Sequence, residues 1–205
     1  MAACLCLVIA GAAALSQQNN LTPGGISIPG TGGEGGVDGG KEGVMYSVAV
    51  YPATESEENV ASADVISLTE NEALNNSLAE HLPKQLPEGF HYGRGSLYST
   101  VMKDETQYHM LRVEYISGEI PEQQFTEDGG AIAPDPETIG DVFIVCVMNY
   151  EPETDHNIYT SSEEVSLSLL EENRNACIRT EDCYVLVFTN TAEPAAVWDA
   201  LRNIV

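Results

Sequence analysis

The spacing of hydrophobic residues divides the chain from residue 44 onward into short strands and helices. Residues 44–51 are rich in β-branched and aromatic side chains and stop before Pro52, which predicts a strand. An acidic loop is expected next, followed by an amphipathic helix within residues 66–87 that ends near Pro83. Thr69 and Glu72 have the spacing of a capping box at the start of this helix. Its apolar stripe consists of Ala73, Leu74, Leu78 and Leu82.

The strongest strand pattern lies in residues 89–101 and 107–116, which flank a turn-like segment. The second run alternates with a period of two, as is typical of a strand covered on one face. The two runs predict a long antiparallel hairpin, and a turn at Asp104 and Glu105 would place His109 opposite Thr100. The glycines of "GRGS" at residues 93–96 predict a bulge or bend, because the segment lacks the full glycine pattern and the lysine of a phosphate loop.

The remaining elements follow a long acidic loop at residues 117–140. Residues 141–150 are apolar on both faces, which is typical of a central strand. Residues 161–173 predict a short helix, with Ser161 and Glu164 as its capping box. Residues 176–188 predict a second hairpin, and residues 191–205 a final helix with Pro194 in its first turn. This order predicts an α+β fold: an antiparallel sheet of about six strands with helices packed on one face.

The first 43 residues have a different composition. Residues 1–15 are apolar, lack the basic n-region of a secretory signal and are shorter than the roughly 20 residues that span a bilayer. We expect them to be a partial transmembrane segment whose beginning lies upstream. "MAAC" looks like the end of a lipobox, but the apolar residues after Cys4 favour a membrane span.

Residues 16–43 are mostly Gly, Ser, Pro and short polar residues, which predicts a flexible linker with an end-to-end distance of roughly 30 Å. Residues 44–205 would then form an extracytoplasmic domain. The chain carries a formal net charge of −24 at pH 7 and has a pI near 4.1, which argues against nucleic acid and anionic lipid head groups as partners. Hydrophobic residues make up 43% of the chain, enough to fill a core beneath this acidic surface.

No catalytic, cofactor-binding or metal-binding residues are predicted. The histidines share no ligand spacing with one another or with the cysteines; they are His81, His91, His109 and His156. The acidic loop lacks the alternating oxygen ligands of a calcium loop. The chain contains no Gly-x-Ser-x-Gly elbow and no Cys–His pair placed by a motif. These observations predict a protein that is not an enzyme.

The cysteines fall into two groups. Cys4 and Cys6 lie in the apolar run, and Cys146, Cys177 and Cys183 lie in the folded part. Cys177 and Cys183 flank a five-residue loop and would face each other if the hairpin turned there, which allows a disulfide. A two-residue turn would instead put them out of register. Both alternatives stay open, and a structural role is favoured over a catalytic one.

Two stretches carry a resemblance to a known family. The chain closes on "RTEDCYVLVFTNTAEPAAVWDALRNIV", and "LPKQLPEGFHYGRGSLYST" gives a Leu-Pro-x-Gly-Phe lead into the first hairpin. Together they resemble uncharacterised extracytoplasmic domains of Gram-positive gut bacteria, which follow a single membrane span and in several cases form the C-terminus of membrane-bound anti-sigma factors. The resemblance covers residues 80–205 and departs at Cys183, where such domains usually place a glycine.

The resemblance implies a membrane-anchored sensor or binding domain that receives a protein or cell-envelope ligand outside the cell, as the outer part of an anti-sigma-factor-like regulator. Two alternatives remain. A secreted or surface adhesion module would expose an apolar patch that includes several of Tyr92, Tyr98, Tyr108 and Tyr115. A cell-envelope hydrolase would need a deep pocket lined by His91, His109 or the acidic loop.

Overall fold

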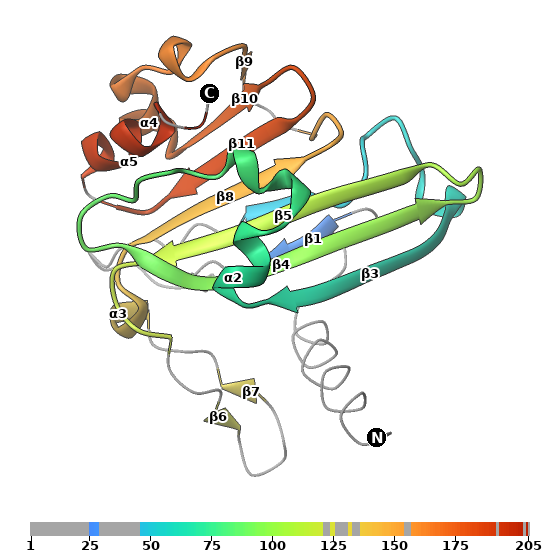
Figure 1. Cartoon of the computed structure of the whole chain (residues 1–205), viewed down its shortest axis with the longest axis horizontal. Helices are drawn as coiled ribbons and strands as arrows, with labels where there is room; N and C mark the ends of the chain where they lie inside the picture. The colour runs from blue at the N-terminus through green and yellow to red at the C-terminus, as the bar shows by residue number, and fades with distance from the viewer. Residues whose placement is uncertain are drawn as a thin grey trace, which may run out of the picture.

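A twisted sheet of seven strands forms the centre of the molecule (Figure 1). The structure, a computed structural model, describes residues 25–28, 46–120, 124–125, 131–132, 136–153, 157–191, 193–202 and 204. The strand order across the main sheet is β3-β4-β5-β8-β11-β10-β9. All neighbours in it are antiparallel except β9 and β10, which are parallel. Two further sheets have two strands each, β1-β2 and β6-β7.

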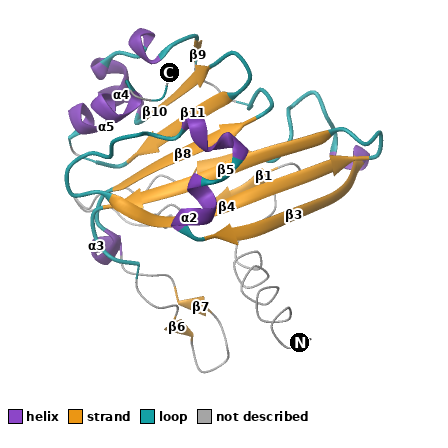
Figure 2. Ribbon diagram, in the orientation of Figure 1, coloured by secondary structure: helices purple, strands orange, loops and turns teal. Residues whose placement is uncertain are grey.

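The strands of the main sheet are β3 Val60–Leu68, β4 His91–Met102, β5 Gln107–Ile116, β8 Val142–Met148, β9 Ile158–Tyr159, β10 Asn175–Arg179 and β11 Tyr184–Thr189. The smaller sheets contain β1 Gly25–Ile28, β2 Tyr46–Ala49, β6 Gln124–Phe125 and β7 Ala131–Ile132. The α-helices are α2 Glu70–Leu74, α3 Pro136–Ile139, α4 Leu167–Asn173 and α5 Pro194–Leu201. The 3-10 helices are η1 Glu57–Asn59, η2 Ser77–His81 and η3 Ser162–Glu164. Figure 2 shows how short these helices are beside the sheet.

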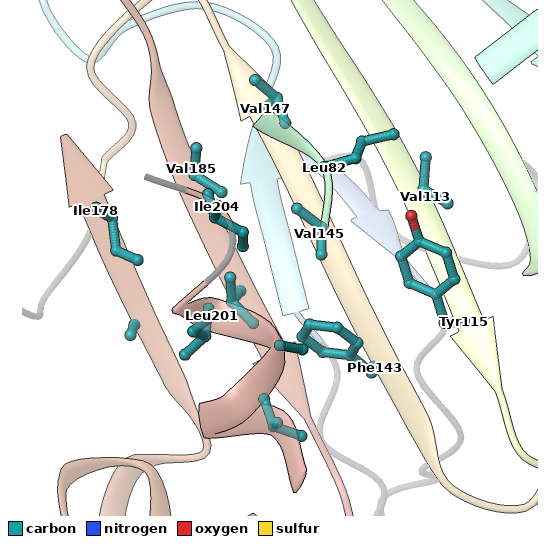
Figure 3. Close-up of a cluster of buried hydrophobic side chains, with 14 of the residues drawn as sticks. Leu82, Val113, Tyr115, Phe143, Val145, Val147, Ile178, Val185, Leu201 and Ile204 are labelled. Atoms are coloured by element: carbon teal, nitrogen blue, oxygen red, sulfur yellow. The ribbon is translucent and has the colours of Figure 1, made fainter. Parts of the chain in front are cut away.

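Each face of the main sheet carries its own hydrophobic cluster. In the first cluster, Phe143, Val145 and Val147 of β8 pack with Leu201 of α5 (Figure 3). Val197 of α5 belongs to the same cluster. Buried residues from α2 and α4 belong to this same cluster. The second cluster uses the alternate residues of the same strands together with the segment around β2; it includes Val48, Val50, Tyr98, Met110, Ile144, Cys146, Met148, Cys177, Leu186 and Phe188. The central strands are therefore buried on both sides, because successive side chains point to opposite faces.

The long hairpin, the central strand, the second hairpin and the final helix are confirmed as β4–β5, β8, β10–β11 and α5. The predicted antiparallel sheet of about six strands is corrected to a mixed sheet of seven. The molecule is mostly sheet, and its few helices do not make the clear layer on one face that the sequence predicted. The predicted one-sided burial of residues 107–116 is also wrong, because seven consecutive residues of β5 from Met110 onward are buried.

The largest difference between the sequence prediction and the structure concerns residues 60–82. The segment expected to be an acidic loop and the start of a helix is strand β3, whose side chains from residue 61 to residue 67 are all exposed. An edge strand with neither face buried carries no alternation of apolar and polar residues for a sequence pattern to detect. The Thr69–Glu72 capping box is confirmed, but the helix it starts ends at Leu74, whose side chain is 57% exposed.

Two local predictions about turns and caps are also corrected. Glu105 adopts a left-handed backbone (φ 71°), and the turn spans three residues between Met102 and Thr106. The odd loop length shifts the register by one, so His109 pairs with Ser99 and not with Thr100. Ser161 makes no capping hydrogen bond with its side chain. The expected bulge in "GRGS" is confirmed by a register shift between Tyr92 and Arg94.

The N-terminal predictions fall mostly outside the described residues. Within the predicted linker, residues Gly25–Ile28 form strand β1 and pair antiparallel with β2. The predicted partial transmembrane segment, residues 1–15, is not described. Within the part of the chain given above, no helix combines the length and the apolar composition needed to cross a bilayer.

Candidate functional site

The histidines named from the sequence lie far apart. His91 pairs with Ile116 at one end of the β4–β5 hairpin, and His109 pairs with Ser99 toward the other end. The eight-residue offset along β4 corresponds to about 27 Å. His91 and His109 therefore do not line one common pocket, and the hydrolase alternative stays a prediction. His156 and parts of the acidic loop, residues 121–123, 126–130 and 133–135, lie outside the described residues.

One serine–histidine contact exists on this hairpin. Ser99 Oγ lies 3.1 Å from His109 Nδ1, within the range of a nucleophile and its base. A Ser-His-Asp triad needs the acid on the far side of the imidazole. Here Asp64 of β3 pairs with Ser99, so the serine lies between the carboxylate and the imidazole. The contact is thus a cross-strand hydrogen bond and does not complete a triad.

Cys177 and Cys183 face opposite sides of the sheet. Cys177 belongs to the second hydrophobic cluster, whereas Cys183 belongs to the first. Both are free and buried, as is Cys146. Thr180 N–H donates to the Cys183 carbonyl at 2.9 Å, which closes the turn between β10 and β11, and Cys177 pairs with Leu186. The disulfide that the sequence left open is therefore not formed.

The cysteine thiols are shielded from water. Burial raises the pKa of Cys146 to about 12, with a further increase from Glu114 and a decrease from Arg112. Burial also raises the pKa of Cys177 to about 12 and that of Cys183 to about 11. Reactive cysteines depend on a lowered pKa, so these thiols have the character of structural residues when no metal is bound.

The second face of the sheet contains a buried ion pair that the sequence did not reveal. Arg112 and Glu114 lie next to each other on one face of β5 and are each 6% exposed. Arg112 Nη2 contacts Glu114 Oε1, and Arg94 Nε donates to Glu114 Oε2 at 2.6 Å. Arg112 is the cross-strand partner of Cys146, which places the pair among the residues of the second cluster. The alternation along residues 107–116 showed that Arg112 and Glu114 share one face of the strand. It did not show that this face is covered.

The tyrosines named for the adhesion alternative do not form an exposed patch. Tyr98 is 8% exposed and Tyr115 is 4% exposed, so both are part of the core. Tyr92 is half-buried, and its hydroxyl donates to the Leu68 carbonyl at 2.6 Å. Tyr108 packs edge to face against Tyr150. These side chains stabilise the domain, and the adhesion surface predicted from them is not present.

The most exposed apolar side chains of the sheet lie on β3. Val65 is 40% exposed and Ile66 is 56% exposed. Because β3 is the first strand of the main sheet, its hydrogen-bonding groups on the side away from β4 face no strand of that sheet. Six acidic residues lie in β3 or within five residues of its ends in the chain; they are Glu55, Glu57, Glu58, Asp64, Glu70 and Glu72.

A compact group of potential metal ligands lies at the turn between β10 and β11. His81 at the end of η2 lies beside Asp182 and Cys183 of this turn, and their ligand atoms are all within 4.8 Å of one another. His81 Nε2 is 3.2 Å from Asp182 Oδ1. Sequence spacing gave no signal for this group, because His81 and the Asp-Cys pair belong to different, distant elements. The packing of η2 on the sheet brings them together.

Comparison with known proteins identifies no relative: no protein-family model, no curated protein and no solved structure matches this chain.

Proposed function

We propose that the chain contains a non-enzymatic binding or sensor domain, anchored to a bacterial membrane through residues 1–15, and that it binds a basic, extended segment of a partner protein along β3. The observation that carries this proposal is the nine-residue edge strand β3, exposed from residue 61 to residue 67. Natural proteins usually protect sheet edges with prolines, bulges, lysines or a covering segment. β3 contains neither proline nor lysine, and its register shift against β4 lies at its start, between Val60 and Ser62, which leaves the rest of the strand regular.

An extended partner segment would extend the main sheet by one strand. Main-chain hydrogen bonds supply the affinity in this mode of recognition, and alternate side chains supply the specificity. Val65 and Ile66 are neighbours in the strand, so they offer one apolar contact on each face of the extended sheet. The net charge of −24 and the carboxylates around β3 favour a basic partner. The same charge opposes pairing between two copies of this chain.

The membrane part of the proposal is independent of this surface. It is supported by the apolar run at residues 1–15, by the glycine-rich composition of the segment that follows it, and by the resemblance to the outer domains of membrane-bound anti-sigma factors. In such an arrangement, partner binding outside the cell would be communicated through residues 1–43 to the membrane. The domain would then be the outer part of an anti-sigma-factor-like regulator.

A peptide titration tests the β3 surface. The probe is a synthetic Lys-Val-Lys-Val-Lys-Val-Lys peptide, with a Glu-Val peptide of equal length as its counterpart, followed by NMR spectroscopy of the isotope-labelled chain. We expect saturable amide shifts concentrated in residues 60–68 with the lysine peptide only. The double variant Asp64→Lys/Ile66→Lys should weaken binding of the lysine peptide by about tenfold or more, because it removes an attractive charge and an apolar contact.

Leu167→Lys provides the matched control, because Leu167 is an exposed apolar residue of α4 (36% exposed) and not part of the edge. This variant should bind the lysine peptide as the unmodified chain does. Shifts scattered over the whole acidic surface, or equal weakening by Leu167→Lys, would refute the β3 surface.

Anchoring is tested in bacterial cells that express the full chain from its own gene. We expect the protein in the membrane fraction and its folded domain to be digested by protease added to intact protoplasts. Recovery in the soluble cytoplasmic fraction, protected from protease, would refute the anchored arrangement and would leave the peptide test unaffected.

A further inference from the structure

We infer that His81, Asp182 and Cys183 form a binding site for a transition-metal ion of the zinc type. The three residues supply an imidazole nitrogen, a carboxylate oxygen and a sulfur, and these atoms lie within 4.8 Å of one another. Imidazole, carboxylate and thiolate are the ligand types of protein zinc sites. At metal–ligand distances of about 2.0–2.3 Å, tetrahedral ligands lie roughly 3.3–3.8 Å apart, so small side-chain rotations would bring the group to coordination distance.

The position of His81 suits a metal ligand. The side chain of His81 is 13% exposed, and its Nε2 is buried without a hydrogen-bond partner. The 3.2 Å approach of Asp182 Oδ1 therefore has the distance of an ion pair but not the geometry of a hydrogen bond. A buried ring nitrogen without such a bond is costly. A metal ion between the nitrogen and the carboxylate would satisfy both.

The other two ligands are fixed by the turn that carries them. Thr180 Oγ1 accepts from Cys183 N–H at 3.0 Å and lies 3.2 Å from Asp182 Oδ1. Cys183 is 4% exposed and belongs to the first hydrophobic cluster, whereas the Asp182 side chain is 63% exposed. The site thus has a buried soft ligand, a buried imidazole and a carboxylate at its mouth, through which an ion can enter from solvent.

The charges of the group match a divalent ion. The Cys183 thiol loses its proton to the buffer as the sulfur–metal bond forms, so one thiolate and one carboxylate neutralise one Zn²⁺. This neutrality matters because burying an unbalanced charge is costly. Three protein ligands leave a fourth tetrahedral position, which water fills in open zinc sites. Glu80, whose Oε1 lies 3.6 Å from His81 Nε2, is close enough to serve as an alternative fourth ligand.

The metal would join two segments that are distant in the chain. η2 and the turn between β10 and β11 would be connected through one ion, and its binding would stabilise the folded chain. This inference does not depend on partner binding at β3, because β3 contributes no ligand to the group.

The test uses the full chain, freed of metal by a chelator and kept reduced. Co²⁺ is the spectroscopic probe and Zn²⁺ the calorimetric one. We expect one metal ion per chain, visible absorption bands of tetrahedral cobalt and a thiolate-to-cobalt band in the near ultraviolet. Zn²⁺ at about a hundredfold excess over its Kd should raise Tm by about 5 °C or more.

The single variants Cys183→Ser, His81→Gln and Asp182→Asn should each weaken Zn²⁺ binding at least tenfold, and Cys183→Ser should abolish the near-ultraviolet band. Cys177→Ala is the matched control, since Cys177 is an equally buried thiol on the opposite face. It should keep both the band and the affinity, as should the Cys4→Ser/Cys6→Ser double variant. Circular dichroism of each variant distinguishes loss of the site from loss of the fold.

Two results would overturn the site. One is weak binding of several Zn²⁺ ions per chain without a thiolate band. The other is Zn²⁺ binding that all three ligand variants retain. Either outcome would assign the ions to the acidic surface of a chain with net charge −24. Mg²⁺ in excess separates the two cases, because it competes for surface carboxylates and not for a thiolate–imidazole site.

Discussion

The buried ion pair between Arg112 and Glu114 provides the sharpest test of the core. Glu114→Gln keeps the shape of the side chain but removes its charge, which leaves a guanidinium that is 6% exposed without its counter-ion. Arg94 is less affected, because its side chain is 48% exposed and water replaces the lost partner. Two unit charges 4 Å apart attract by about 4 kcal/mol at an effective dielectric constant near 20. Removing one partner of a buried pair costs about 3–5 kcal/mol, in agreement with that figure.

The expected result is a loss of about 4 kcal/mol in the free energy of unfolding and a decrease in Tm of about 10 °C. The measurement is urea unfolding followed by the fluorescence of Trp198, the single tryptophan of the chain, which packs against the first hydrophobic cluster. Trp198 packs against the first cluster, whereas Arg112 pairs with Cys146 of the second cluster on the opposite face, so the Trp198 signal reports global unfolding.

The double variant Arg112→Met/Glu114→Leu separates the two contributions to this loss. It removes both charges, so no buried charge is left unpaired, and it should recover most of the stability lost in Glu114→Gln. A loss below about 1 kcal/mol in Glu114→Gln would show that solvent reaches the pair in solution. A double variant less stable than the single one would show that the pair itself, and not the stranded charge, dominates the energy.

Two further predictions follow from the thiols and from the capping box. Cys146, with a pKa raised to about 12 by burial, should resist alkylation by iodoacetamide at pH 8 in the folded chain and react rapidly in urea, as peptide mass spectrometry would show; rapid labelling of the folded chain would contradict its burial. Thr69→Ala should lower Tm at pH 7 by removing the cap of α2, and should lower it less at pH 2, where Glu72 is protonated. The hydrogen bonds from Thr69 lower the pKa of Glu72 below its usual value of 4.5, so its stabilising contribution is present above that pH and is lost as the pH falls through the lowered pKa. An equal difference in Tm at both pH values would contradict the role assigned to Glu72.

Strands with a buried face were predictable because their packing leaves a periodic pattern in the sequence. β8 is apolar on both faces, and β5 alternates between two kinds of side chain, so both were located correctly. β3 and β9 left no such pattern. β3 is exposed along most of its length, and β9 has two residues, too few for any period to appear.

The candidate sites depend on contacts between distant segments, and local sequence patterns do not encode such contacts. Alternation placed Arg112 and Glu114 on one face of a strand, but the packing of the segment around β2 decided that this face is buried. Similarly, the capping residue Asn76 starts η2 locally, whereas its position against the sheet brings His81 to Asp182 and Cys183. The sequence thus determined the strands that face a core, the Thr69–Glu72 capping box and the charge of this protein. The tertiary structure decided which faces are covered and which ligand atoms meet, because burial and proximity follow from the packing of the whole chain.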